Sequence, residues 1–221
     1  MVYFSGGDIV KNIPAFTVAS GIAGLILEEI PYKQIAYIKI LSSQTPAELL
    51  AECVSFCKAA GAEHIYATGH EYLETYPLHT SVMEMELPRA EIQQTIAEAL
   101  PVAMNEIADW IADFNVKMFS VPNAATMTRQ RAETLCSEGC AYYVYDGSEK
   151  IGLGVASGKE IRAIISLVPG RGQDVLCALC DVLTEDKITV EVASNNDKAV
   201  RLYRRMGFTE KQVISHWYII C

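Results

Sequence analysis

The chain has 221 residues, of which 51% are apolar and 20% are charged. This composition is typical of one or two folded domains and excludes a disordered chain. No apolar run approaches the ~20 residues that a membrane-spanning helix needs. The segment Met1–Asp8 lacks the basic and apolar regions of a signal peptide. We therefore expect a cytoplasmic protein with no membrane partner.

The formal net charge of −9 is unevenly distributed along the chain. Residues 1–114 contain five basic and fifteen acidic residues, whereas residues 115–221 contain thirteen basic and twelve acidic residues. An acidic chain disfavours non-specific binding of nucleic acid. The second part keeps enough cations for a local anion site.

The seven cysteines are an odd number and predict free thiols rather than a disulfide framework. Cys53 and Cys57, like Cys177 and Cys180, lie at helical spacing within apolar stretches. No second C-x-x-C motif completes a four-ligand zinc set. We interpret these cysteines as small buried hydrophobic residues and expect no metal site.

The first part of the chain predicts a sheet covered by one helix. Thr45 is a candidate N-cap, with Pro46 at the first helical position and Gly61 just beyond the end. The expected strands are Ala15–Ala19, Gly21–Glu29, Gln34–Leu41, Glu63–Thr68 and His79–Leu87.

A helical connector is expected over Arg89–Phe114, with Pro101 as a break. A strand at Val116–Val121 and a helix at Asn123–Ser137 follow in the prediction. Asp-Gly and Ser-Gly turns then predict an antiparallel meander. The remaining expected elements are strands at Ala141–Tyr145, Lys150–Ala156, Ile161–Val168, Lys187–Ala193 and Lys211–Ile220, and helices at Val175–Leu183 and Asp197–Met206.

One segment of the last helix carries a specific pattern. It reads Asn196-Asp197-Lys198-Ala199-Val200-Arg201-Leu202-Tyr203-Arg204-Arg205-Met206-Gly207-Phe208. It resembles the N-x-x-A-x-x-L-Y-x-x-x-G-F pattern of the Gcn5-related N-acetyltransferase (GNAT) family at every fixed position. The resemblance covers residues 115–221. It implies an α/β (α+β) fold with a mixed, largely antiparallel sheet flanked by helices.

The strand and helix order of the first part parallels that of the second. We therefore expect three regions: a degenerate GNAT-like N-terminal domain (1–88), the helical connector (89–114) and a GNAT acetyltransferase-like domain (115–221). The stretch from Leu41 to Pro46 lies where the first domain would have its phosphate loop, but it contains neither glycine nor arginine.

The resemblance implies acetyl-CoA as acyl donor. The backbone of the strand before the glycine loop would bind pantetheine, and loop amides at the following helix would bind pyrophosphate. The implied cofactor-binding residues are Ser166, Leu167, Val168, Gly170, Arg171, Gly172, Gln173, Asp174, Val175, Asn196, Ala199 and Arg204. Arg201, Arg204 and Arg205 share one helix face, which either reaches CoA phosphates or is simply solvated.

The loop departs from the family pattern Q/R-x-x-G-x-G/A. Asp174 replaces a glycine and adds a negative charge, and Leu176 replaces a small residue and adds bulk. In one interpretation the loop is shifted, so that Gly170 and Gly172 supply the amides, Arg171 grips phosphate and Asp174 caps the helix. In the other, the cofactor site has decayed.

Two residues are candidate catalytic groups. The resemblance implies that Tyr203 protonates the departing thiolate; the alternative is a core tyrosine. Glu191 is the leading candidate for the general base if its side chain faces the cleft, and a surface charge if it faces solvent. His216 on the last strand is expected to be structural.

The sequence thus predicts an acetyl-CoA-dependent N-acyltransferase that acts on the amine of a small molecule or peptide in a ternary complex. The alternative is a non-catalytic GNAT-like module that binds a ligand or a protein through a decayed CoA site. The last strand is also suited to extend a sheet across a homodimer.

Overall fold

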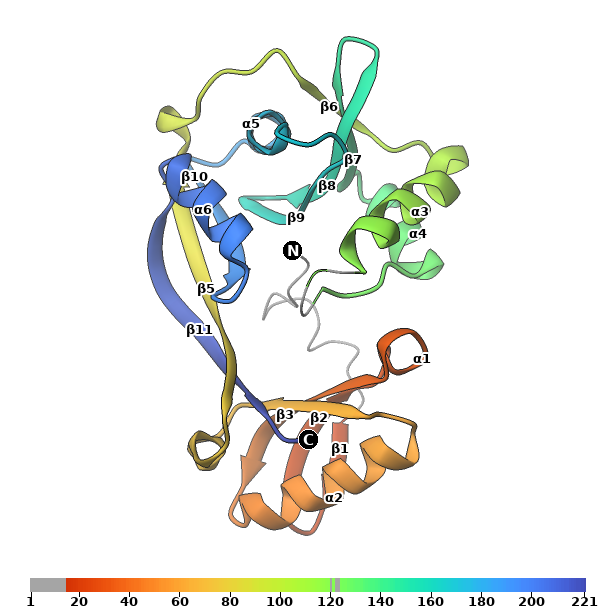
Figure 1. Cartoon of the computed structure of the whole chain (residues 1–221), viewed down its shortest axis with the longest axis vertical. Coiled ribbons are helices and arrows are strands. Elements are labelled where there is room, and N and C mark those ends of the chain that lie inside the picture. Colours follow the sequence, from red (N-terminus) through yellow and green to blue (C-terminus); the bar gives the residue numbers. More distant parts are fainter. Residues whose placement is uncertain (1–14, 120, 122–123) are drawn as a thin grey trace. The chain divides into compact units, whose positions relative to one another are not determined.

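The computed structural model describes residues 15–119, 121 and 124–221, which form two compact units (Figure 1). Unit 1 contains Met83–Gln212, and unit 2 contains the described residues up to Val82 together with Val213–Cys221. Both divisions fall inside long strands, β5 (Leu78–Pro88) and β11 (Thr209–Ile219), so each strand supplies residues to both units. The expected boundaries at 88 and 114 therefore differ from the observed division.

Unit 2 is a sheet with the strand order β1-β2-β3-β4-β11-β5. The strands β1, β2 and β3 pair antiparallel, and β3 and β4 pair in parallel. The helix α2 connects β3 to β4 in the chain. The elements are β1 (Ala15–Val18), β2 (Gly21–Ile26), α1 (Ile30–Lys33), β3 (Ile35–Ser43), α2 (Pro46–Ala59), β4 (His64–Thr68) and a 3-10 helix (Glu71–Thr75).

The helix α2 covers the apolar face of this sheet. It begins at Pro46 as predicted, although the side chain of Thr45 makes no capping hydrogen bond. Leu49, Cys53 and Cys57 are buried with strand residues such as Ile38. The amphipathic pattern of the sequence therefore placed this face correctly.

Unit 1 is a sheet with the strand order β11-β5-β10-β9-β8-β7-β6. Neighbouring strands β6 to β9 are antiparallel, and β9 pairs with β10 in parallel. The elements are 3-10 helices at Arg89–Glu91 and Met104–Glu106, β6 (Glu98–Pro101), α3 (Ile107–Met118), α4 (Arg129–Ser137), β7 (Ala141–Asp146), β8 (Glu149–Ser157), β9 (Glu160–Ser166), α5 (Gly172–Asp181), β10 (Lys187–Ala193) and α6 (Asp197–Arg205).

Two glycines on β8 let α5 pack directly on the sheet. A β-carbon at Gly152 would lie 2.4 Å from Val175, and one at Gly154 would lie 2.4 Å from Leu179. Any larger residue would push the helix outward, because packed interiors leave no room for an extra methyl group. The Gly-Leu-Gly sequence of β8 thus sets the depth at which α5 sits.

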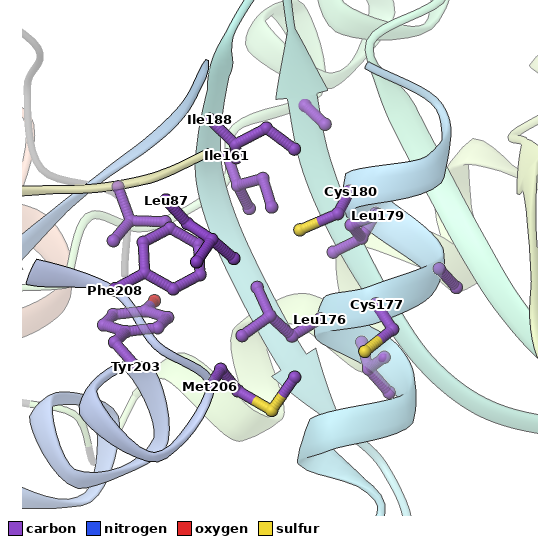
Figure 2. Close-up of a cluster of buried hydrophobic side chains, with 14 of the residues drawn as sticks. Leu87, Ile161, Leu176, Cys177, Leu179, Cys180, Ile188, Tyr203, Met206 and Phe208 are labelled. Atoms are coloured by element: carbon purple, nitrogen blue, oxygen red, sulfur yellow. The ribbon is translucent and has the colours of Figure 1, made fainter. Parts of the chain in front are cut away.

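The core of unit 1 lies between the sheet and helices α5 and α6 (Figure 2). Its cysteines, Cys177 and Cys180, are free and buried, as expected. Burial raises the pKa of Cys177 to about 11 and that of Cys180 to about 12, so both thiols stay protonated. Cys53 and Cys57 are likewise free and buried in unit 2.

The prediction for the middle of the chain is wrong in two places. The stretch Arg89–Phe114 is not a continuous helix, because Glu98–Pro101 forms the edge strand β6 against β7. The expected strand at Val116–Val121 is instead the end of α3, which continues to Met118. The predicted helix start at Asn123 lies outside the described residues, as does Met1–Asp8. The helix α4 begins at Arg129, where Thr128 caps the Arg131 amide.

None of the described helices is long and apolar enough to cross a membrane.

Candidate functional site

The parallel strands β9 and β10 are paired over only two residue pairs and then diverge. Glu160 pairs with Thr189 and Ile161 with Val190, and β10 then continues without a partner in β9. On its other side, β9 carries an extra residue: Val155 pairs with Ala163, but the next residue of β8, Ala156, pairs with Ile161. The skipped residue is Arg162. A bulge of this kind bends its strand, which accounts for the opening between β9 and β10.

Unit 2 lacks such an opening at the equivalent pair of strands. All five residues of β4 pair with β3, from His64 opposite Ile35 to Thr68 opposite Lys39. The next residue, Gly69, approaches the backbone of Ile40 so closely that a β-carbon would lie 2.3 Å from its carbonyl oxygen. The splayed edge is thus a property of unit 1.

The end of β9 has backbone groups of Ser166 on the open side. The amides of Leu167 and Val168 both donate to the Ile151 carbonyl of β8. Contrary to the prediction, these two amides are therefore not available to a ligand. Because neighbouring strand residues point their amides in opposite directions, the amide of Ser166 faces the opening. Its hydroxyl donates to the Val168 carbonyl at 2.6 Å.

The glycine loop leads into the N-terminus of α5. Gly170 has a φ of +84°, which only glycine adopts without strain. In the described part of the chain, the amides of Gly172, Gln173 and Asp174 have no acceptor, as is usual in the first helical turn. Together with the helix dipole they give this end a partial positive charge.

Arg171 does not point a free guanidinium into this loop. Its Nε donates to Asp174 at 2.6 Å, and its Nη2 donates to Asp146 at 2.6 Å. The hydrogen bonds to Asp174 and Asp146 raise the pKa of Arg171. The predicted grip of Arg171 on phosphate is therefore replaced, in this structure, by a double ion pair.

Two further loop residues make contacts that the sequence did not predict. The amide of Val175 donates to the Arg171 carbonyl, so its hydrogen bond is already used within the helix. Leu176 does not crowd the loop, because it is fully buried in the core (Figure 2). The neighbouring Gln173 side chain donates to Gln93 at 2.7 Å, and Leu202 of α6 lies beside Gly172, 3.5 Å from the position of a β-carbon there.

The helix α6 begins as the sequence pattern requires. The Asn196 side chain accepts a hydrogen bond from the Ala199 amide at 3.2 Å and so caps the helix. Ala199 packs, partly buried, on the core of unit 1. Arg204 is exposed and paired with Glu210 of β11. Asn196 and Ala199 thus have evident structural roles, and Arg204 already has a carboxylate partner.

Tyr203 lies in the core between α5 and α6. Its side chain is 1% exposed and its ring packs on Phe208, with centroids 5.6 Å apart. Burial raises the pKa of its hydroxyl, with a smaller contribution from Cys180. The hydroxyl has no hydrogen-bond partner among the described residues, which is unusual for a buried polar group.

Glu191 lies on the opposite face of the sheet. Its neighbours Val190 and Val192 pack toward α5 and α6, so alternation along β10 directs Glu191 away from these helices. Burial, followed by the charges of Glu160 and Glu84, raises the pKa of Glu191 to about 7. Glu160 pairs with Arg162 and Glu84 with Lys211, whereas Glu191 forms no ion pair with any described residue.

Comparisons with known proteins bear on the architecture. No family model matches the sequence, and no curated protein matches it. Among solved structures, a GCN5-related N-acetyltransferase from Kribbella flavida aligns with a TM-score of 0.59 at 13% identity, over 96% of this chain and 91% of its own. One from Sphaerobacter thermophilus aligns with a TM-score of 0.56 at 13% identity, over 91% and 77%. This chain has the GNAT fold.

A conserved protein of unknown function from Staphylococcus epidermidis is equally similar, with a TM-score of 0.59 at 12% identity over 94% of this chain and 93% of its own. The GNAT fold therefore does not by itself specify an activity. The fold class predicted from the α6 pattern is confirmed.

Sequence reasoning missed three contributors to this part of the GNAT fold: the bulge residue Arg162, the two helix-seating glycines of β8, and Asp146. The Gly-Leu-Gly spacing was a visible signal of a close approach. Asp146 carried no signal, because it is separated from Arg171 by 25 residues and serves as an ordinary turn residue in the sequence.

Proposed function

We propose that this protein is an acyl-CoA-dependent N-acyltransferase, which transfers an acetyl group to the amine of a small molecule or peptide by direct attack. The observation that carries the proposal is the opening between β9 and β10 beyond Ile161 and Val190, next to the unpaired amides at the start of α5. An open strand edge accepts an extended, amide-containing chain as an added strand.

The residues of the site fit the pantetheine arm of acetyl-CoA better than its phosphates. The Ser166 amide at the open edge suits a pantetheine arm. The amides of Gly172 and Gln173 suit a phosphate, but Asp174 lies in the same helical turn, and its network with Arg171 and Asp146 has a net negative charge that opposes one. Acetyl-CoA supplies the thioester that the amine cleaves.

Glu191 is the proposed proton acceptor. A carboxyl group with a pKa of about 7 is half ionised at neutral pH, which suits proton transfer from an acceptor amine, directly or through water. Its position without an ion-pair partner among the described residues leaves both oxygens available for this role.

Tyr203 is the proposed proton donor to the leaving thiolate. The hydroxyl is protonated at neutral pH and has no competing acceptor within the described chain, but the burial that raises its pKa also makes it a weaker acid while the core stays closed. Because the side chain is 1% exposed, this role requires the neighbouring core residues, such as Leu176 and Met206, to move apart when the donor binds.

Isothermal titration calorimetry with acetyl-CoA is the first test, followed by a colorimetric assay of CoA release with a panel of primary amines. We expect binding in the micromolar range and amine-dependent thiol release that the Glu191→Gln variant reduces at least tenfold. The Glu133→Gln variant, which removes an exposed carboxylate from α4, is the matched control. No binding at millimolar acetyl-CoA would refute the proposal.

The ion pairs of Arg171 favour a second candidate, a GNAT-like binding module without catalysis. In that case acetyl-CoA does not bind, and a partner protein or another ligand does. The amine acceptor, the absence of nucleic-acid binding and a homodimer remain predictions.

A further inference from the structure

The guanidinium of Arg171 is held between carboxylates from two different elements. Asp146 is the last residue of β7, and Asp174 lies in the first turn of α5. Each carboxylate accepts one hydrogen bond from Arg171, at 2.6 Å in both cases. One cation therefore faces two anions, and the three groups together carry a formal charge of −1.

This network adjoins the place where a phosphate would bind. Asp174 and the unpaired amides of Gly172 and Gln173 belong to the same helical turn. A second negative charge within a few ångströms of a phosphate is repulsive, by about 1 kcal/mol in water and more where water is excluded. The same two carboxylates also accept the hydrogen bonds that the Arg171 guanidinium would otherwise donate to a phosphate.

The network is partly exposed to water. The side chains of Arg171, Asp146 and Asp174 are 28%, 27% and 37% exposed. Because Arg171 and Asp174 lie at the start of α5, the network is positioned to influence a ligand at the loop.

We propose that Asp146 and Asp174 determine donor selectivity by withholding Arg171 from phosphate, so that the site binds the pantetheine arm and disfavours the pyrophosphate. This inference rests on the proposed function, because it assumes that the opening at β9 accepts an acylated pantetheine. It assigns to Asp146, the last residue of β7, a role in donor selectivity.

Calorimetric titration of acetyl-CoA and of S-acetylpantetheine, which lacks phosphates, tests the proposal. We expect Asp146→Asn and Asp174→Asn each to tighten acetyl-CoA binding about tenfold, a change equivalent to about 1.4 kcal/mol. S-acetylpantetheine binding should change less than twofold. Glu133→Gln should leave the affinities for both ligands unchanged, since it neutralises a paired carboxylate on α4.

A second substitution separates the release of Arg171 from simple loss of charge. Adding Arg171→Gln to Asp146→Asn should abolish the gain in acetyl-CoA affinity. If the gain persists, or if the single variants bind acetyl-CoA no better than the parent protein, the inference is overturned.

The two ligands also distinguish this inference from the proposed function. If S-acetylpantetheine binds the parent protein but the Asp variants do not change acetyl-CoA binding, only the selectivity proposal fails. If neither ligand binds any of the variants, the donor site itself is absent and both proposals fail.

Discussion

Ile161 of β9 and Val190 of β10 form the last residue pair between these two parallel strands. The bulge at Arg162 follows at once, and it turns the rest of β9 away from β10. Beyond this pair, Glu191 is the first side chain of β10 on the face opposite α5 and α6. The geometry of one register shift thus places the candidate base beside the opening.

Glu191 should give the acid limb of the pH–rate profile. A base must be ionised to act, so kcat/KM should rise with pH and level off above the Glu191 pKa of about 7. The measurement is kcat/KM from pH 5 to 9. In Glu191→Gln this limb should disappear along with most of the activity; a limb that survives assigns the titration to another group.

The same carboxyl group should make stability depend on pH. Its pKa is raised in the folded state above the unfolded value of about 4.3, so the native protein binds a proton more tightly than the unfolded chain. Stability is therefore lost as the pH rises from about 4.5 to 7. After allowance for partial exposure, Glu191→Gln should stabilise the protein by about 1–2 kcal/mol at pH 8.

Urea denaturation of both proteins at pH 4 and pH 8 checks this prediction. At pH 4 the two should have nearly equal stability, because Glu191 is protonated in the folded state and mostly protonated in the unfolded state. A difference of the same size at both pH values would show that the substitution acts through packing.

Replacement of Tyr203 by Phe should separate catalysis from packing. The hydroxyl has no partner in the described structure, so its removal should leave Tm unchanged or slightly higher. If the hydroxyl donates the proton, kcat should fall about tenfold or more while acetyl-CoA affinity stays the same. An unchanged kcat would assign Tyr203 to the core alone.

Gly154→Ala should destabilise the protein by about 1–3 kcal/mol. The added methyl group meets the Leu179 side chain at 2.4 Å and the Ala163 carbonyl at 2.6 Å, so α5 must shift. Gly172→Ala is the matched control, because its methyl group meets only Leu202 at 3.5 Å. Equal losses of stability in chemical denaturation would contradict the close packing of α5 on β8.

Leu176→Ala should reduce stability by about 2–5 kcal/mol. The side chain is fully buried in the cluster with Tyr203, Met206 and Phe208 (Figure 2), and its truncation leaves a cavity. Chemical denaturation measures the loss. The outcome that contradicts this view is a stable variant with improved acetyl-CoA binding, as expected if Leu176 crowded the loop.

The N-x-x-A-x-x-L-Y-x-x-x-G-F segment could be read from the sequence because its contacts are local. Asn196 caps Ala199 three residues away, and Gly207 ends the helix with a φ of +94°. The turns at Gly147 and Gly158, both with a φ of +59°, are local in the same way. The helix predicted over Arg89–Phe114 failed because edge pairing of β6 with β7 overrode its apolar periodicity.

Outside the stretch from Arg89 to Ser137, the sequence by itself therefore determined the order of the main strands and helices, most helix ends and the apolar faces, since these depend on neighbouring residues and on the spacing of hydrophobic side chains. Only the tertiary structure decided where Leu176 points, whether Arg171 is free and how far Glu191 is buried. These properties depend on residues distant in sequence: Met206 and Phe208 around Leu176, Asp146 beside Arg171, and Glu84 and Glu160 near Glu191. Burial and charge at a site arise from such long-range neighbours, which no local pattern specifies.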